Sequence, residues 1–266
     1  HADGELVGLH VRISGQSINA WLNPTAIKDG KDERQVQGLW AQAGDAQFGY
    51  TIPNLLTEYA MRNTHVPVGP WRGVNTNQNG VYSECFMEEV ARAAGKDSLE
   101  FRRALMKNHP KHLAVLNAAA EKGNWGKPLP PGVYRGIAQF MGYASYSAAT
   151  AEVSVSAKGE VKVHRMVLAL NCGHVVNPDQ VAAQVEGSVA YGLSATFFGE
   201  NTIENGRVKE LNGKKVIDEL GVEVREPGLL KSVKAIGWFI EEYGIAQISM
   251  NLTNINITPL HIAFDT

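Results

Sequence analysis

Hydrophobic and polar residues alternate in several short stretches of this chain, the pattern typical of β-strands. The alternation runs through residues 5–18 and returns over 55–68, so we expect a strand in each. Between them, residues 23–49 are polar and contain several glycines without a sustained period, which indicates a long irregular segment of the kind that often carries function. Two further strands are predicted over 150–156 and 161–170, joined by a Lys-Gly turn of hairpin type.

Apolar residues at helical spacing predict three consecutive helices in the middle of the chain, over 79–94, 98–106 and 112–122. In the second helix Ser98 is placed to cap the N-terminus. Residues 126–136 hold three prolines and three glycines, so we expect a connector without regular structure there.

A longer helix is predicted from Pro178 to about Phe198, with an apolar stripe opposite a side of small residues. The stripe consists of Val181, Val185, Val189 and Leu193. The character of the sequence changes near residues 205–213. Beyond that point we expect a helix over 230–243, a strand over 246–252 and the start of another helix at Thr258.

These elements predict an α+β fold with mixed sheets and packed helices, followed by a small α/β unit. We place the domain boundary between residues 208 and 209, which gives regions 1–208 and 209–266.

Composition limits the classes of function. With 44% hydrophobic and 20% charged residues the chain reads as soluble and globular, and its net charge of -2 offers no basic field for nucleic acid. No apolar stretch is long enough to span a bilayer. The N-terminus shows no leader peptide and is expected to be internal to a longer protein, so the sequence gives no localisation.

The cysteines and histidines do not form a recognisable metal site. Cys85 and Cys172 are far apart and neither belongs to a C-x-x-C pair, which argues against an iron-sulfur cluster, a zinc site or a disulfide framework. No two histidines have the spacing of a helical metal site, so no metal ligand is assigned. Cys85, inside a predicted helix, is interpreted as a core residue.

One candidate binding segment is the tripeptide Trp71, Arg72 and Gly73, between two prolines and a predicted helix. Such a loop directs backbone N–H groups and a guanidinium toward one space, which suits an anionic or polar ligand. The alternative is a buried arginine that donates to carbonyl groups under a loop.

A second candidate is the turn around Gly173, which leads into the helix that carries Gln184 and Gly187. A strand, a glycine turn and a helix lined by small residues can form the edge of a ligand site, and the alternative is that the glycines only allow tight helix packing. Near the C-terminus, Asn251 and Asn254 could bond a ligand through their amides, although asparagine is also an ordinary turn residue.

Three stretches carry a resemblance over residues 1–207: PVGPWRGVNTNQNGVYSECFMEEVARAAGKDSLEFRRALM, YRGIAQFMGYASYSAATAEVSV and VLALNCGHVVNPDQVAAQVEGSVAYGLSAT. Their order and spacing resemble the molybdenum-binding large subunit of the xanthine dehydrogenase and aldehyde oxidase superfamily, and most of all its isoquinoline 1-oxidoreductase beta-subunit type. The resemblance implies hydroxylation of an electron-poor carbon in an N-heterocycle or aldehyde, with an iron-sulfur small subunit as partner.

The resemblance also implies the residues that line a molybdopterin site, which are Trp71, Arg72, Gly73, Gln184, Gly187 and, as a weaker candidate, Gly173. The family's N-terminal glycine-rich cofactor segment and its late G-V-G-E-P-type motif, which bears the base glutamate, have no counterpart in this sequence. The catalytic residues therefore stay unassigned, and we expect the chain to be inactive alone.

A second resemblance begins where that motif should follow. The sequence VREPGLLKSVKAIGWFIEEYGIAQISMNLTNINITPLHIAFD resembles the C-terminal subdomain of glutamate formimidoyltransferase, a folate-dependent enzyme, over about 213–265. It implies Asn251 and Asn254 as weak folate-facing candidates, while the subdomain with the family's catalytic histidine is absent.

Three hypotheses follow from these resemblances. The leading one is an incomplete or chimeric molybdopterin-binding subunit of a molybdenum hydroxylase. The second is a segment of a folate-dependent formimidoyltransferase. The third is an artificial chimera without enzymatic function.

Overall fold

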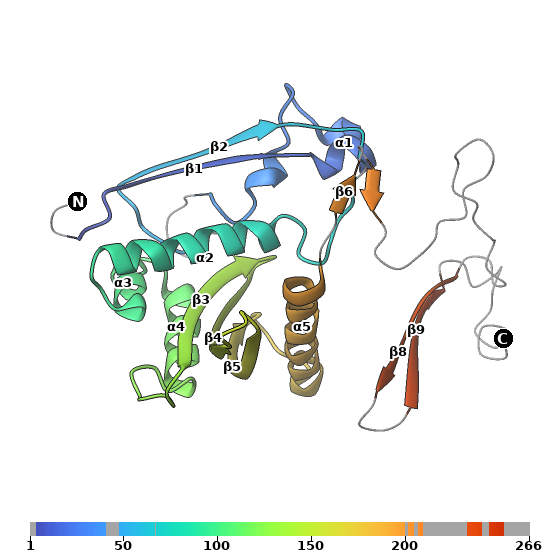
Figure 1. Cartoon of the computed structure of the whole chain (residues 1–266). Coiled ribbons are helices and arrows are strands. Elements are labelled where there is room, and N and C mark those ends of the chain that lie inside the picture. Colours follow the sequence, from blue (N-terminus) through green and yellow to red (C-terminus); the bar gives the residue numbers. More distant parts are fainter. Residues whose placement is uncertain are drawn as a thin grey trace, which may run out of the picture. The chain divides into compact units, whose positions relative to one another are not determined.

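A computed structural model describes residues 4–40, 48–66, 68–199, 202–204, 207–209, 233–240 and 245–252 (Figure 1). The chain divides into two compact units, His1–Glu200 and Asn201–Thr266, and each is described by itself. The architecture is α+β, with parallel and antiparallel sheets and packed helices, as the sequence predicts.

The first unit begins with a two-stranded parallel sheet. Strand β1 (Gly8–Gly15) pairs along its whole length with β2 (Asn54–Met61). Parallel strands need a long crossover, and the irregular segment predicted between them supplies it. The described part of this crossover contains helix α1 (Ile18–Leu22), which precedes the predicted irregular segment, and two 3-10 turns, η1 (Pro24–Ala26) and η2 (Glu33–Val36).

A buried carboxylate holds this crossover together. Asp32 accepts hydrogen bonds from Ser17 Oγ at 2.5 Å, Asn19 Nδ2 at 3.0 Å, Gln35 Nε2 at 3.3 Å and Arg34 N at 3.1 Å. Burial would raise the pKa of Asp32, but these hydrogen bonds outweigh burial and lower it. The side chain is therefore ionised at neutral pH and ties α1 to η2.

The three predicted helices are present as α2 (Thr76–Ala93), α3 (Ser98–Leu105) and α4 (Pro110–Lys122). The cap predicted for the second helix is wrong by one residue. Asp97 caps α3 by accepting from Leu99 N and Glu100 N, both at 3.0 Å. A carboxylate is a good N-cap, and the Ser98 hydroxyl instead donates to Glu88.

Helix α2 buries only part of the apolar residues whose spacing predicts it: Val90 and Ala94 pack against the core. Val81 and Phe86 are 61% and 47% exposed, and Cys85, interpreted from the sequence as a core residue, is also exposed. Met87 and the polar Glu84 are buried instead. The helix turns this way because Glu84 finds charged and polar partners in the interior.

A three-stranded antiparallel sheet follows, in the order β3 (Val133–Gly142), β4 (Ser145–Val155) and β5 (Val161–Asn171). The predicted β4–β5 hairpin is confirmed. The connector predicted over residues 126–136 ends earlier, because β3 begins at Val133. The strand was hidden by Gly136, which lies within it opposite Ala151.

The core lies between this sheet and the helices. Helix α4 packs against all three strands, with Leu116, Ala119 and Ala120 buried. Residues of α2, α3 and the segment around Phe48 complete one hydrophobic cluster. Figure 1 shows β3 rising at an angle to end next to α2.

Helix α5 (Pro178–Phe198) has the predicted bounds, with Asn177 as N-cap accepting from Gln180 N at 3.2 Å. Its predicted valine and leucine stripe is half-buried, whereas the opposite side is exposed. None of its residues is fully buried. Within the part of the chain that the structure describes, no helix has the length and apolar character needed to cross a membrane.

The second unit contains two antiparallel hairpins, β6 (Thr202–Glu204) with β7 (Arg207–Lys209) and β8 (Val233–Ile240) with β9 (Ile245–Leu252). The strand predicted over 246–252 is confirmed. The helix predicted over 230–243 is wrong, because residues 233–240 form a strand.

A short apolar run fits both the helical spacing and the alternation of a strand, so the sequence alone does not distinguish them. Here the valine, isoleucine and aromatic residues of β8 belong to a strand that pairs with β9, which is also rich in apolar residues. The helix start predicted at Thr258 lies outside the described residues.

Candidate functional site

The segment Trp71–Val74 forms a tight turn directly before α2. Val74 N donates to Trp71 O at 2.8 Å, and Thr76 N donates to Gly73 O at 3.0 Å. Asn77 Nδ2 also donates to Arg72 O. The carbonyl groups of Arg72 and Gly73 are thus bound by α2, and the side chains of Trp71 and Arg72 are exposed.

Two consecutive residues of this turn have left-handed backbone conformations. Gly73 has φ 89°, and Val74 has φ 51°, which is rare for a β-branched residue. An added Cβ at Gly73 would also lie 2.2 Å from Asn77 Oδ1. Such strain is of the order of 1–3 kcal/mol, and it persists only where the surroundings hold the backbone in place.

Buried asparagines at the start of α2 provide that support. Asn75 Nδ2 donates to Arg34 O at 2.9 Å, and Asn79 Nδ2 donates to the carbonyl oxygens of Gln35 and Gln37, both at 2.9 Å. Both asparagines are at most 2% exposed. The turn is therefore anchored through α2 to the segment around η2.

The buried cluster around Glu84 fixes α2 to the rest of the unit. Glu84 Oε1 accepts from Tyr50 Oη at 2.6 Å, and Glu84 Oε2 accepts from Arg102 Nε at 3.1 Å. Gln139 N in β3 donates to the same Oε2 at 3.1 Å, so the carboxylate also covers the outer edge of the sheet. His112 Nδ1 lies 2.7 Å from Gln139 Oε1 and extends the cluster to α4.

Electrostatics in this cluster favour a neutral tyrosine. Burial, and next the charge of Glu84, hold the pKa of Tyr50 well above its usual range, so its hydroxyl donates. The Arg102 guanidinium is 0% exposed and also reaches Glu88 Oε2 at 3.3 Å. The sequence did not predict this cluster.

The exposed side of α5 carries the second group of predicted site residues. Gln184 and Gly187 are both exposed, and Tyr191 continues the same helix face at i, i+3 and i+7. Among the described residues, no atom lies within 4 Å of a Cβ added to Gly187. The alternative of tight helix packing at this glycine is therefore wrong for the described part of the chain.

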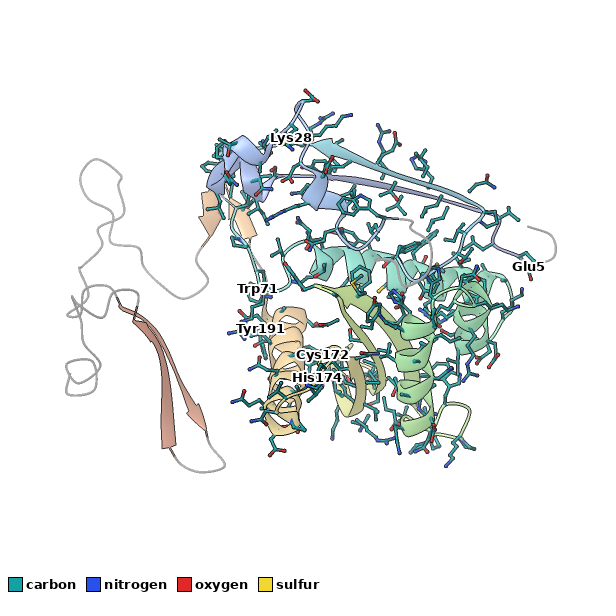
Figure 2. The ribbon with its side chains drawn as sticks, turned by 180° about the vertical axis from the view of Figure 1, so that it is seen from behind. Glu5, Lys28, Trp71, Cys172, His174 and Tyr191 are labelled. Atoms are coloured by element: carbon teal, nitrogen blue, oxygen red, sulfur yellow. The ribbon has the colours of Figure 1, made fainter. Side chains whose placement is uncertain are left out.

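Tyr191 joins this helix face to the turn before α2. Its ring lies 5.0 Å from the Trp71 ring, with an interplanar angle of 45°. The Arg72 guanidinium carbon lies 5.0 Å from the centre of the same tyrosine ring. Figure 2 shows Trp71 and Tyr191 next to each other.

The structure therefore brings two of the predicted segments together. Arg72 is exposed, so the alternative of a buried arginine under a loop is wrong. Tyr191 was missed, although its spacing from Gln184 and Gly187 was a usable signal.

Gly173 lies in the exposed turn after β5, with φ 82°. Its N–H already donates to Asn171 Oδ1 at 3.1 Å, so it is less suited to a ligand than the sequence indicates. The neighbouring Cys172 is partly exposed and His174 is exposed (Figure 2).

Of the two asparagines predicted to face folate, only Asn251 lies among the described residues. Asn251 lies in β9 opposite Lys234, and Asn254 lies outside the described residues. Within the described ranges, no group of three or more histidine, cysteine, aspartate or glutamate side chains is arranged to hold a metal ion.

Comparison with protein families gives two matches that meet near the change of character in the sequence. Residues 83–213 match the molybdopterin cofactor-binding domain. Residues 201–266 match the formiminotransferase domain.

Individual relatives agree with these matches. A membrane-bound aldehyde dehydrogenase (pyrroloquinoline-quinone) of Gluconacetobacter polyoxogenes is 32% identical over 149 residues, which is 48% of this chain and 19% of the relative. Isoquinoline 1-oxidoreductase subunit beta of Brevundimonas diminuta is 27% identical over 168 residues, covering 61% of this chain and 21% of the relative.

A formimidoyltransferase-cyclodeaminase of Dictyostelium discoideum is 49% identical over 49 residues, 18% of this chain and 9% of the relative. Among solved structures, the aldehyde oxidoreductase of Desulfovibrio gigas aligns with a TM-score of 0.30 and 21% identity, over 61% of this chain and 19% of that protein. The chain thus spans about a fifth or less of the length of these relatives.

Proposed function

We propose that the turn Trp71–Gly73 and the exposed face of α5 bind molybdopterin. Residues 83–213 of this chain belong to the molybdopterin cofactor-binding domain of the xanthine dehydrogenase and aldehyde oxidoreductase family. The observation that carries this proposal is the contact of Trp71 and Arg72 with Tyr191. It unites a flexible cation and two aromatic rings on one exposed surface.

The residues present fit such a cofactor. Trp71 is 52% exposed and offers a ring face on which a flat pterin can stack. Arg72 supplies a planar guanidinium of the kind that binds phosphate oxygens. The open surface at Gly187 leaves room beside these groups, and Gln184 adds an amide that can donate or accept.

When bound, the cofactor would supply the redox chemistry, and the chain would bind and orient it. Arg72 would hold an anionic group, the ring of Trp71 would fix the plane of the pterin, and the supported turn would keep both side chains in place. Gly173, whose N–H is already bonded, would contribute less.

The full reaction belongs to a larger assembly in this proposal. The substrate class is an N-heterocycle or an aldehyde, and the partner is an iron-sulfur subunit, since two curated relatives are themselves named as subunits. This chain contains no G-V-G-E-P-type segment with a base glutamate, so we expect it to oxidise no substrate alone. Oxidation of an aldehyde by the purified chain with a dye acceptor would contradict this.

Cofactor content tests the proposal directly. The full chain is purified anaerobically from a host that makes molybdopterin, and molybdenum and oxidised pterin are quantified per chain. Arg72→Ala should lower the affinity for molybdopterin about ten- to hundredfold, and with it the cofactor content, because a charge-assisted hydrogen bond to phosphate is lost. Arg12→Ala, which removes an arginine from the exposed side of β1, is the matched control.

Equal cofactor content in Arg72→Ala and the unmodified chain would refute the assignment. A protein that carries pyrroloquinoline quinone and no pterin would refute the choice of cofactor, and this matters because one relative is named for that quinone.

A second candidate function rests on the match of residues 201–266 to the formiminotransferase domain. We propose that, if this region acts, it contacts folate near Asn251 and Asn254, with the domain boundary at about residue 208. A folate analogue that raises the unfolding temperature of the full chain, without molybdopterin binding, would favour this candidate. If neither ligand shifts the temperature, the hypothesis of a non-enzymatic chimera is favoured.

A further inference from the structure

Tyr191 is the residue at which the turn and the helix of the candidate site meet. Its ring contacts Trp71 and lies under the Arg72 guanidinium, each at 5.0 Å. Neither the sequence patterns nor the relatives' names assign it a role.

The geometry points to Tyr191 as a positioning residue that holds Arg72 for an anionic group of the bound cofactor; this inference rests on the proposed function. Arg72 is exposed, and its only described side-chain contact is the tyrosine ring. An exposed arginine side chain samples many rotamers, and binding an anion requires one of them. A ring that already holds the guanidinium lowers that entropic cost before the ligand arrives.

The backbone on both sides of the contact is suited to this role. On the arginine side, the carbonyl oxygen of Arg72 accepts from Asn77, and the following Gly73 and Val74 are held in left-handed conformations. On the helix side, Tyr191 lies in the interior of α5 and does not fray with a helix end. The remaining freedom is in the arginine side chain, and the tyrosine ring restricts it.

The ring face, and not the hydroxyl, is the part of Tyr191 that this role requires. A cation above an aromatic ring at an exposed site contributes an amount equivalent to about a two- to fivefold change in an equilibrium constant. Tyr191→Phe keeps the ring and should bind within about twofold of the unmodified chain. Tyr191→Leu keeps an apolar side chain but removes the ring, and should weaken binding about two- to fivefold.

A double-mutant cycle separates positioning from direct contact. Binding of anaerobically prepared molybdopterin is measured by tryptophan fluorescence for the full chain and for Tyr191→Leu, Arg72→Ala and the double variant. If Tyr191 acts through Arg72, Tyr191→Leu has no further effect in the Arg72→Ala background. Tyr82→Leu, which alters a helical tyrosine that is 55% exposed on α2, is the matched control and should bind normally.

Arginine side-chain NMR gives a readout that does not need the ligand. In the unmodified chain, the Arg72 Nε–H proton should be shifted upfield by the tyrosine ring current. The shift should remain in Tyr191→Phe and disappear in Tyr191→Leu. An Arg72 signal that does not change in Tyr191→Leu overturns the inference, whatever the binding data.

The failures are distinguishable. If the unmodified chain binds no molybdopterin while Tyr191→Leu releases Arg72, the proposed function falls and Tyr191 holds an arginine without a cofactor role. If the unmodified chain binds and Tyr191→Leu weakens binding equally with and without Arg72, Tyr191 contacts the ligand itself and the positioning role is wrong. If Tyr191→Leu binds as well as the unmodified chain, the role is also wrong.

Discussion

Arg102→Met should destabilise the first unit by about 3 kcal/mol, because it leaves the buried Glu84 carboxylate without its cation. The Arg102 side chain is 0% exposed and that of Glu84 is 7% exposed, so water cannot replace the lost partner. Removing one member of a buried ion pair typically costs about 3–5 kcal/mol. Three neutral hydrogen bonds to Glu84, from Tyr50 Oη and from Gln139 N and Nε2, remain and place the expected value at the low end.

Equilibrium urea unfolding followed by circular dichroism measures this change. Arg103→Met is the matched control, since the neighbouring arginine pairs with an exposed Glu100 and should change stability by about 0–1 kcal/mol. Adding Glu84→Gln to Arg102→Met removes the uncompensated charge but keeps an acceptor for Tyr50. This double variant should be more stable than Arg102→Met alone.

A loss below about 1 kcal/mol for Arg102→Met would refute the reasoning, since values of that size are typical of exposed pairs. A double variant less stable than Arg102→Met would refute it as well. If the double variant is the less stable one, the destabilisation by Arg102→Met comes from lost packing and not from the isolated charge of Glu84.

Three further predictions concern single sites. The pKa of Asp32 in the folded chain lies below its usual value of 3.8, so its ionisation stabilises the fold above that pH and the contribution is lost as the pH falls further. Asp32→Asn should flatten this part of the stability–pH curve, and an unchanged slope would contradict it. Gly49→Ala should cost about 1–3 kcal/mol, because a Cβ there would lie 2.5 Å from Nδ1 of the buried His112; an unfolding midpoint equal to that of the unmodified chain would contradict this. Gly187→Ala should stabilise α5 by about 0.5–1 kcal/mol, since the added methyl group meets no described atom. Any cofactor bound there would bind more weakly to this variant. Thermal unfolding and cofactor content measure the two effects, and a less stable variant would show that the surface at Gly187 is not open.

Much of the secondary structure could be predicted because its signals are local. The start of α5 at Pro178 follows from an asparagine cap and a proline within a few residues. The β4–β5 hairpin follows from alternation on both sides of a Lys-Gly turn. Where the local signal was ambiguous, prediction failed: residues 233–240 fit a helix and a strand, and pairing with β9 decided for the strand.

The candidate site could be predicted only in part. The sequence singled out Trp71, Arg72, Gln184 and Gly187, but as two separate segments. The sequence could not show that the turn and α5 meet, because the contact between them is made by Tyr191 and depends on how α5 lies against the turn. The orientation of α2 was likewise hidden, since an exposed Phe86 and a buried Glu84 reverse the usual preference of these residue types.

The sequence by itself determined the kinds of most elements, many of their ends and the two family segments, because capping, periodicity and motif order act within short stretches of chain. Only the tertiary structure decided which side of α2 is buried and that Arg72 rests on Tyr191. Burying a charge is favourable only when partners arrive from distant segments, and Glu84 finds them in Tyr50, Arg102 and Gln139. The positions of those partners depend on the whole fold. They fix the orientation of α2 and therefore of the turn before it, which carries the candidate site.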